Sequence, residues 1–599
     1  MTTRTLVLIL TVLCGILCLI VQASSSGQQS HNSASLQKAS AQRASEAHAA
    51  IPRLIDITAS TRIHFDHLAS PEKKYIVESM SGGVALIDYD RDGWPDIYFT
   101  NAPDVGMHLA GKKARSALFH NNHDGTFTDV TDKAGVGFPC WAMGATVGDY
   151  NNDGWPDLLV TCFNGVVLYR NNGDGTFTDV TKQTGLDKDS GWATGAAFGD
   201  YDNDGWADLF VPHYAKLDLS ALPEFGSKIT CTYHKIKVQC GPRGLPGSPD
   251  ALYHNNGDGT FTDVSQSAGV ADAQGLLGLG SVWSHFNNGD HIDLFVANDS
   301  GPNYLYRNNG DGTFSEIGYN SGTAFSQDGN EQANMGIAVA DYNHTGRESI
   351  FVSHFSEDYG TLWRNDGNLL FADVSYASGI AHSTLPYVGW GDVFVDLDNT
   401  GWPDLFLVNG HVYPQVDTEP LMSKYKEPKL LFMNEHDGQF KDVSKVAGEA
   451  LQVPQVSRGV AAGDLFNDGR IDLVIENLEG QPMILRPEVR PHNHWISLEL
   501  AGTKRNRLAL NAQVKVIASS LTQTDEVRSG GSYMSQSDLR LHFGLGDHTQ
   551  ADRIEILWPS GTKETLTNLA ADQFYCVEEG AGAVACSKIR PAPSSKGRR

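Results

Sequence analysis

The chain has 599 residues, of which 40% are hydrophobic and 62 are glycine, and it carries a net charge of −26. This length allows several domains or one large repeat architecture with a sizeable core. The strong negative charge argues against a nucleic-acid backbone as a partner, and it suits an exported protein or a cation binder.

The N-terminus has the pattern of an export signal. A positive charge within residues 1–4 precedes the apolar run Leu6–Val21, and Val21–Ala23 resembles a cleavage site. We therefore predict a signal peptide at 1–23 and an extracellular, cell-surface or periplasmic location. Because the run approaches spanning length, a membrane anchor is the alternative. No other long apolar run occurs, so after cleavage we expect no integral membrane protein.

Two segments have compositions that favour flexibility. Residues 24–50 are rich in Ser, Ala, Gln and His and predict a linker, whereas residues 581–599 predict a disordered tail. Six cysteines remain after cleavage, and an even number in an exported chain favours disulfides. Of 15 possible connectivities we favour neighbour pairing: Cys140–Cys162, Cys231–Cys240 and Cys576–Cys586. Zinc is the weaker interpretation because there is no CxxC pair.

An acidic motif occurs seven times, beginning with DYDRDGWPD at 88–96. The later copies are DYNNDGWPD (149–157), DYDNDGWAD (200–208), HFNNGDHID (285–293), DYNHTGRES (341–349), DLDNTGWPD (396–404) and DLFNDGRID (464–472). Each copy lies between a small-residue apolar run and a short β-branched or aromatic run. Such runs, bounded by turn residues, predict strands.

A second motif, typified by LYRNNGDGTFTDVT, alternates with the first and predicts a hairpin. One unit then holds four strands, and seven units in tandem predict a seven-bladed β-propeller over residues 51–490. The seventh acidic motif lacks its hairpin, whereas LIDITASTRIHF (54–65) precedes the first motif. We predict that this segment completes the seventh blade; an open array or fewer blades is the alternative.

Two further regions depart from the repeat. An insertion at about 215–249 carries Cys231 and Cys240, and long loops of this kind tend to be functional. Residues 491–580 contain alternating apolar and polar runs, which predict a small β-sandwich or barrel. Within it, RSGGSYMSQSD is either a binding loop or a structural turn.

These motifs resemble a known family. The acidic loops between short strands look like FG-GAP/VCBS repeats, which resemble the calcium-bearing blades of integrin α propellers. The segments EVRSGGSYMSQSDLRLHFGLGD and DRIEILWPSGTKETL resemble the ASPIC/UnbV domain, and the combination resembles the cartilage acidic protein family, which also has bacterial members. The sequence departs from that pattern at NRLALNAQV, where the family usually has a glycine near Asn511.

Calcium takes six to eight oxygen ligands, and the acidic loops offer carboxylates at alternating positions with a glycine at the turn. Zinc is disfavoured by the missing thiolates and imidazoles, and magnesium demands a stricter octahedron. We therefore predict structural Ca²⁺. The predicted ligands, with each tryptophan contributing its carbonyl, are Asp88, Asp90, Asp92, Trp94, Asp96, Asp149, Asn151, Asp153, Trp155, Asp157, Asp200, Asp202, Asp204, Trp206, Asp208, Asp396, Asp398, Thr400, Trp402, Asp404, Asp464, Asp468 and Asp472.

The seven copies are unequal. The loops that begin at Asp88 and Asp200 are complete, the loop at Asp464 loses a ligand at Phe466, and those at His285 and Asp341 are degenerate. For the degenerate copies the alternative is an acidic turn held by its own hydrogen bonds.

A ligand is expected on the face opposite the acidic loops, where polar and aromatic residues gather; alternatively, those residues cap strands or stack between blades. They are Asn101, Trp141, Trp192, His213, Asn298, Asp299, Asn334, His354, Asn409, His411 and Arg458. No HExxH, GxSxG or P-loop motif is present, so we expect no enzyme. We predict a monomeric binding or adhesion module for an unknown protein or glycan; the alternative is a propeller hydrolase or lyase acting on glycans.

Overall fold

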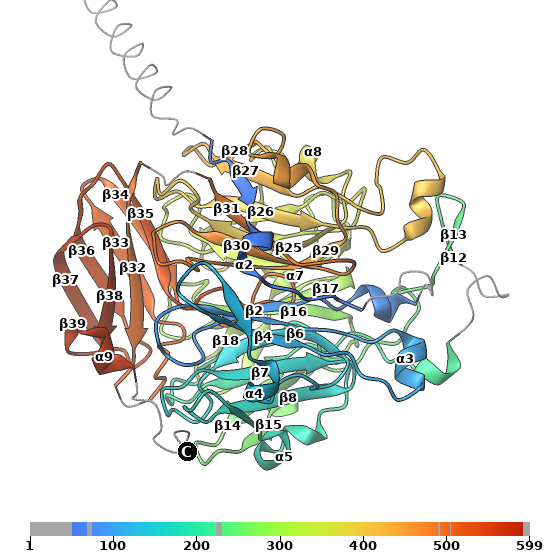
Figure 1. The fold of residues 1–599 in the computed structure, drawn as a ribbon, viewed down its shortest axis with the longest axis horizontal. Coiled ribbons are helices and arrows are strands. Elements are labelled where there is room, and N and C mark those ends of the chain that lie inside the picture. The colour runs from blue at the N-terminus through green and yellow to red at the C-terminus, as the bar shows by residue number, and fades with distance from the viewer. Residues whose placement is uncertain (1–50, 69–74, 223–230, 489–491, 504, 591–599) are drawn as a thin grey trace, which may run out of the picture. The chain divides into compact units, whose positions relative to one another are not determined.

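The computed structural model describes residues 51–68, 75–222, 231–488, 492–503 and 505–590. The predicted signal peptide and linker, and residues 591–599 of the predicted tail, lie outside this part of the chain. The described residues are nearly all β, and the strands follow the repeats (Figure 1). Among them, no helix combines the length and the apolar content needed to cross a membrane.

Seven antiparallel sheets of four main strands follow one another along the described chain, and we call them blades 1 to 7. Blade 1 comprises β2 (Val84–Ile87), β3 (Asp96–Phe99), β4 (Ala117–Asn121) and β5 (Phe127–Asp129), and blade 2 comprises β6 (Ala142–Gly148), β7 (Asp157–Cys162), β8 (Gly165–Asn171) and β9 (Phe177–Asp179). Blade 3 comprises β10 (Ala197–Gly199), β11 (Asp208–Val211), β14 (Ala251–Asn255) and β15 (Phe261–Asp263). Blade 4 comprises β16 (Gly278–Ser284), β17 (Asp293–Gly301), β18 (Tyr304–Asn308) and β19 (Phe314–Glu316), with β20 (Gln332–Ala333) beside β17.

Blade 5 comprises β21 (Ile337–Ala340), β22 (Ser349–Val352), β23 (Thr361–Gly367) and β24 (Leu370–Asp373). Blade 6 comprises β25 (Gly389–Val395), β26 (Asp404–Asn409), β27 (Leu430–Asn434) and β28 (Phe440–Asp442). Blade 7 comprises β29 (Ser457–Gly463), β30 (Asp472–Asn477), β31 (Met483–Pro487) and β1 (Leu54–Asp56). Their inner strands contact one another in the closed order β2, β6, β10, β16, β21, β25, β29 and back to β2. The prediction of an all-β propeller is confirmed.

The ring is closed by the N-terminal strand. β1 pairs antiparallel with β31, with Leu54 opposite Pro487 and Asp56 opposite Leu485. The sequence therefore placed the missing strand of the seventh blade correctly. Because β1 and β31 lie more than 400 residues apart in the sequence, their pairing joins the two ends of the repeat array.

Asparagines of the hairpin motif connect neighbouring blades. The side-chain amide of the last residue of β4, Asn121, donates to the carbonyl of Leu465 in blade 7 (2.8 Å). Five more asparagines donate in the same way, at 2.7–2.9 Å, to Tyr89, Tyr150, Tyr201, Phe286 and Tyr342 of the preceding blade: Asn171, Asn255, Asn308, Asn365 and Asn434. At the corresponding position of blade 7 stands Pro487, which has no amide to donate.

Short helices connect the strands, and their bounds are α2 (Thr58–Thr61), α3 (Val105–Leu109), α4 (Thr131–Ala134), α5 (Thr181–Thr184), α6 (Ser265–Ala268), α7 (Gly318–Ser321), α8 (Ala381–Thr384), η1 (Ile76–Ser79), η2 (Leu186–Lys188), η3 (Leu219–Ala221), η4 (Pro414–Thr418) and η5 (Glu449–Gln452). In the described part of the insertion, β12 (Cys231–Tyr233) and β13 (Ile236–Val238) form a hairpin. All three predicted disulfides are present: Cys140–Cys162, Cys231–Cys240 and Cys576–Cys586.

The C-terminal region is a β-sandwich, as predicted. One sheet has the order β35 (Leu541–Gly546), β32 (His494–Ala501), β38 (Gln573–Glu578), β39 (Gly582–Val584); the other has β34 (Leu521–Glu526), β33 (Gln513–Ala518), β36 (Gln550–Leu557), β37 (Lys563–Ala570). The predicted start of the disordered tail at residue 581 is wrong, because β39 and α9 (Cys586–Ile589) are ordered elements. The Cys576–Cys586 disulfide and the ion pair of Arg590 with Glu499 (2.6 Å) hold them.

The asparagine bridges predict a stability effect. In Asn255→Ala, the buried carbonyls of Tyr150 and Ala207 lose their donor, and we expect the free energy of unfolding to fall by about 1–3 kcal/mol. The control is Asn256→Ala, because the neighbouring Asn256 is exposed and bonds only within its own hairpin; it should change stability by less than about 0.5 kcal/mol. Denaturant unfolding measures both, and equal losses would contradict the role given to Asn255.

Candidate metal centre

Two aspartates organise each complete acidic loop. In the first loop, the carboxylate of Asp88 accepts hydrogen bonds from the main-chain N–H groups of Asp92 (3.0 Å) and Gly93 (2.9 Å). Gly93 has φ +94°, which side chains disfavour. Asp96, fully buried at the start of β3, accepts from the main-chain N–H groups of Tyr89 (3.3 Å) and Asn121 (2.7 Å). The carboxylates therefore fold the loop and fasten it to the hairpin strand.

The first-aspartate bond recurs in other copies. Asp149, Asp200, Asp396 and Asp464 each accept a hydrogen bond, at 2.6–2.9 Å, from the N–H of the glycine five residues on. Degenerate Asp341 does the same with Gly346 (2.8 Å). The turn hydrogen bonds, considered as an alternative to metal binding, are thus present in both complete and degenerate loops. Their presence therefore does not distinguish a metal-binding loop from an acidic turn.

Carboxylates converge in three of the loops. Three ligand oxygens lie within 4.8 Å of one another in each of the groups Asp88/Asp90/Asp96, Asp200/Asp202/Asp208 and Asp396/Asp398/Asp404. In two groups a buried oxygen, Oδ1 of Asp90 and Oδ1 of Asp200, has no hydrogen-bond donor. Unpaired oxygens among converging carboxylates fit a hard cation such as Ca²⁺.

The electrostatics of these loops agree with that fit. Burial raises the pKa of Asp88 to about 7, and Glu499 adds to the rise. Burial also raises the pKa of Asp200 to about 8, with Asp208 and Asp204 adding to it. Without a counter-charge, each loop holds carboxylates that resist ionisation, because like charges about 4 Å apart repel by roughly 1–4 kcal/mol at effective dielectrics of 80 to 20. A bound cation would remove that resistance.

In two other loops with predicted ligands, the third ligand residue is already engaged by protein groups. In the loop at Asp149, the side-chain amide of Asn151 donates to Asp153 (2.9 Å). In the loop at Asp464, Asp468 forms ion pairs with Arg470 (2.6 Å) and Arg486 (2.7 Å). Of the predicted ligand sets, the structure gathers three carboxylates closely in the loops at Asp88, Asp200 and Asp396.

The tryptophans predicted to contribute carbonyls have a second role. The main-chain N–H of Trp94 donates to Asp92 (2.9 Å), and Trp155 and Trp206 make the same bond to Asp153 and Asp204. The Trp94 ring stacks on His123, with centroids 4.7 Å apart. In the Asp396 loop, the ring of Trp402 stacks against His344 and His436. These rings pack the loop against hairpins and neighbouring loops.

Two histidines beside the loops were missed from the sequence. Nδ1 of His120 lies 3.1 Å from Asp96, and Nδ1 of His254 lies 3.2 Å from Asp208 and 3.4 Å from Asp202. The contact with the Asp208 carboxylate raises the pKa of His254 to about 9. The signal was in LFHNN and LYHNN, where three other hairpin copies have Arg at the same position and one has Met.

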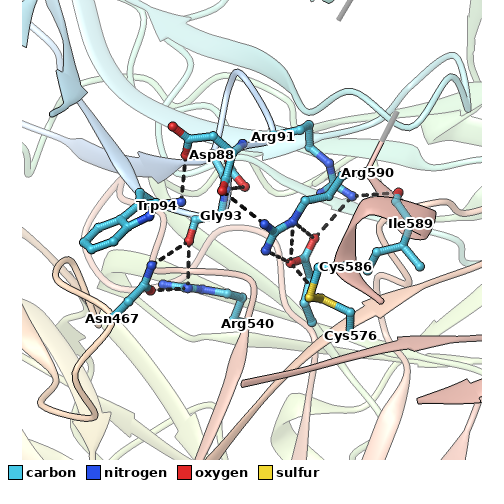
Figure 2. Close-up of polar contacts among 12 residues, drawn as sticks. Asp88, Arg91, Gly93, Trp94, Asn467, Arg540, Cys576, Cys586, Ile589 and Arg590 are labelled. Atoms are coloured by element: carbon cyan, nitrogen blue, oxygen red, sulfur yellow. Dashed lines mark hydrogen bonds and ion pairs between the residues drawn. A yellow bond between two sulfur atoms is a disulfide. The ribbon is translucent and has the colours of Figure 1, made fainter. Parts of the chain in front are cut away.

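All seven acidic loops contact the C-terminal region. Figure 2 shows the first loop, where Arg540 donates to the carbonyl of Gly93 (3.2 Å) and Arg590 to that of Asp92 (3.1 Å). Half-buried Arg91 forms an ion pair with Glu499 of β32 (3.3 Å). The other loops are contacted through Asn152, Asp204, His285, Glu348, Asn399 and Asp464. The C-terminal β-sandwich therefore covers the acidic-loop face of the propeller.

The degenerate loops make ion pairs with this region. His285 bonds to Glu526 (2.7 Å), and Glu348 pairs with Arg528 (2.7 Å). Arg528 also pairs with Asp525 (2.6 Å). Where the aspartate pattern is lost, blades 4 and 5 thus supply side chains that bind the C-terminal region.

The segment RSGGSYMSQSD, residues 528–538, enters the centre of the ring. Its main chain exchanges hydrogen bonds with Val84 and Leu86 of β2 through Gln536, and with Ile337 of β21 through Ser532. Tyr533 and Met534 are buried in the apolar cluster that contains Trp390. Of the two predicted roles, the structural one accounts for these contacts.

The residues expected at the opposite mouth are buried. They are Asn101, Trp141, Trp192, His213, Asn298, Asp299, Asn334, His354, Asn409, His411 and Arg458. Several cap strands: Asn101 donates to the carbonyl of Arg115 (3.1 Å) and Asn409 to that of Pro428 (2.7 Å). The alternative given in the sequence analysis, strand capping, accounts for these two.

Comparisons with known proteins agree with the repeat pattern. The FG-GAP-like repeat model matches residues 88–160, 149–211, 285–352 and 396–475, and the ASPIC and UnbV model matches residues 502–584. Human cartilage acidic protein 1 is 25% identical over 337 residues, which is 55% of this chain and 48% of that protein. The Xenopus tropicalis protein of the same name is 26% identical over 280 residues, or 45% of this chain and 40% of that one.

The chain thus spans about half the length, or less, of the curated relatives it matches. Among solved structures, the Dos1 propeller aligns with 68% of this chain and 94% of its own, at 8% identity and a TM-score of 0.33. The repeat and domain matches fall on the propeller blades and on the C-terminal β-sandwich. The chain therefore carries FG-GAP-like repeats followed by an ASPIC and UnbV domain, and it is homologous to cartilage acidic protein 1.

Proposed function

We propose that this protein is an exported binding module whose acidic loops hold calcium as a structural ion. The observation that carries the proposal is the convergence of unpaired carboxylate oxygens in loops that lie under the C-terminal β-sandwich. Asp88, Asp90 and Asp96 would hold the ion in the first loop. Because these residues come from both ends of the loop between β2 and β3, a bound ion would join two strands of one blade.

The chemistry of the loops favours calcium over catalysis. Calcium would supply charge neutralisation and coordination of hard oxygens. The side chains around the first loop are engaged in holding the fold: Asp88 binds main-chain N–H groups and Arg91 pairs with Glu499. Three disulfides within the described residues support export, because disulfides persist in oxidising compartments.

We place the ligand on the face opposite the acidic loops. The hairpin β12–β13 brings Tyr233 against Phe355, His411 and Tyr413, with ring centroids 5.6–5.8 Å apart. Nδ1 of His411 accepts from the N–H of Tyr413 (3.0 Å), so Nε2 carries the proton, and this buried donor has no acceptor. His411 is itself fully buried, so a ligand would meet the half-buried rings of Tyr233, Phe355 and Tyr413, and such aromatic surface is typical of sites for ligands such as glycans or protein loops.

We also propose that binding is not followed by turnover. His213, a candidate for catalysis in the hydrolase or lyase alternative, has both ring nitrogens engaged, by the carbonyl of Pro249 (2.6 Å) and by Asp189 (3.0 Å). His354 is buried, with Nε2 3.0 Å from Thr361. The His213 ring is occupied by its partners and the His354 ring is buried, so neither ring reaches a ligand at the surface as a general base.

Calcium removal tests the structural role. Chelation should lower the thermal midpoint, because a ligand at 100 times its Kd stabilises the folded state by about 2.7 kcal/mol per site. In Asp200→Asn, which removes one converging carboxylate, we expect most of that increment from the third loop to be lost in calcium, with little change in chelator. An unchanged midpoint on chelation of the wild-type chain would contradict the proposal.

The matched control for this variant is Asp341→Asn. Asp341 makes the same bond to a glycine N–H as Asp200, but its loop ends in Ser349 and gathers no carboxylate cluster. It should therefore leave the calcium-dependent part of the stability unchanged. If both variants lost the same calcium-dependent increment, the effect would come from the turn and not from a metal.

Ligand binding is tested with the full chain on arrays of glycans and of secreted proteins. For a hit on the opposite face, Tyr233→Ala should weaken binding at least 10-fold, whereas Tyr319→Ala, at a tyrosine that is 78% exposed outside this aromatic group, should not. If Tyr233→Ala binds the hits as tightly as the wild-type chain does, the ligand binds elsewhere on the protein. Turnover of a glycan that survives purification and falls on replacement of His213 or His354 would favour the enzyme alternative.

A further inference from the structure

A cavity of about 220 Å³ lies where the inner strands of blades 5, 6 and 7 meet the C-terminal region. It is lined by residues of β21, β25 and β29, by the central segment 528–538 and by the start of β35. At roughly 30 Å³ for each water molecule in the liquid, its volume corresponds to about seven waters. The cavity therefore has room for a small ion with part of its hydration shell.

One lining residue is a carboxylate without a partner. Asp392, in β25, has no exposed surface, and neither of its oxygens receives a hydrogen bond. The neighbouring hydroxyl of Ser353 donates instead to the carbonyl of Trp390 (2.6 Å). An ionised carboxylate removed from water without compensation is very unfavourable. Asp392 therefore needs either a proton or a cation.

The protein does not supply that cation from the cavity wall. Of the two arginines in the lining, Arg528 pairs with Glu348 and Asp525, and Arg540 pairs with Asp538 (2.6 Å). A second unpartnered group comes from the central segment: the hydroxyl of Ser532 is buried, lines the same cavity and has no hydrogen-bond partner. The wall of one cavity thus carries a carboxylate and a hydroxyl group that both lack a hydrogen-bond partner.

We propose that this cavity binds a hard, oxygen-seeking cation, with Asp392 as its charged ligand and Ser532 as a neutral one. The oxygen donors favour sodium, potassium or calcium over a thiophilic metal. Asp396, a predicted ligand of the acidic loop in the same blade, also lines the cavity, but it lies four residues further along the chain, or about 13 Å in an extended strand, so the two aspartates would hold different ions. A bound ion would connect blade 6 to the central segment of the C-terminal region.

The experiment measures thermal unfolding of the full chain in sodium, potassium or calcium chloride against choline chloride at equal ionic strength. Calcium is held in excess in the two monovalent series so that the loops stay in one state. At least one cation should raise the midpoint of the wild-type chain, and Asp392→Asn should raise the concentration for half the effect at least 10-fold. In the calcium arm, native mass spectrometry should count one ion fewer in Asp392→Asn.

The matched control is Glu476→Gln. Glu476 is also a fully buried carboxylate with two unpartnered oxygens, but it does not line the cavity, so its variant should keep the wild-type cation response. If Asp392→Asn fails to fold, Ser532→Ala serves as the second variant and should weaken the cation response at least 3-fold.

The proposal is overturned if Asp392→Asn matches or exceeds the stability of the wild-type chain in choline and keeps its cation response, because Asp392 would then be a neutral acid. It is also overturned if Glu476→Gln loses the response equally. Since the loop aspartates are intact in every variant, failure here would leave loop calcium unaffected, and failure of loop calcium would appear instead in Asp200→Asn.

Discussion

The buried aspartate that ends four of the acidic loops is the constraint on which the blades depend. Asp96, Asp157, Asp208 and Asp404 are at most 1% exposed, and each accepts a main-chain N–H from its own loop and another from the hairpin strand. The hairpin residue that donates to this aspartate is an asparagine, and its side chain reaches the preceding blade. One aspartate and one asparagine thus join the loop to its hairpin and the hairpin to the preceding blade, because buried polar groups must be paired.

This arrangement also fixes what the loop tips present to their surroundings. With the aspartates turned inward on main-chain N–H groups, several loop carbonyls remain available, and Arg540 and Arg590 of the C-terminal region bind them at Gly93 and Asp92. The candidate metal groups therefore lie beside an interface within the chain. The inner strands likewise leave main-chain groups at the ring centre, and the segment 528–538 pairs with them.

The sequence predicted much of this fold because the information was local and repeated. The acidic turns and alternating runs predicted the strands, and the missing hairpin of the seventh unit predicted that 54–65 would complete that blade, as β1 does. The three disulfides followed from proximity in the chain. The ordered β39 and α9 were missed, since besides the predicted disulfide they are held by the contact of Arg590 with Glu499, which no local composition reveals.

For the candidate site, the sequence determined which loops carry carboxylates at alternating positions. Only the tertiary structure decided which of these loops gather unpaired oxygens, because that depends on side chains from elsewhere: Arg486 of β31 pairs with Asp468, and His120 and His254 approach from the hairpins. Nor did any pattern in the sequence predict that the C-terminal β-sandwich covers the acidic-loop face. Local spacing sets the geometry within one loop, whereas burial and charge compensation are set by every strand that packs against it.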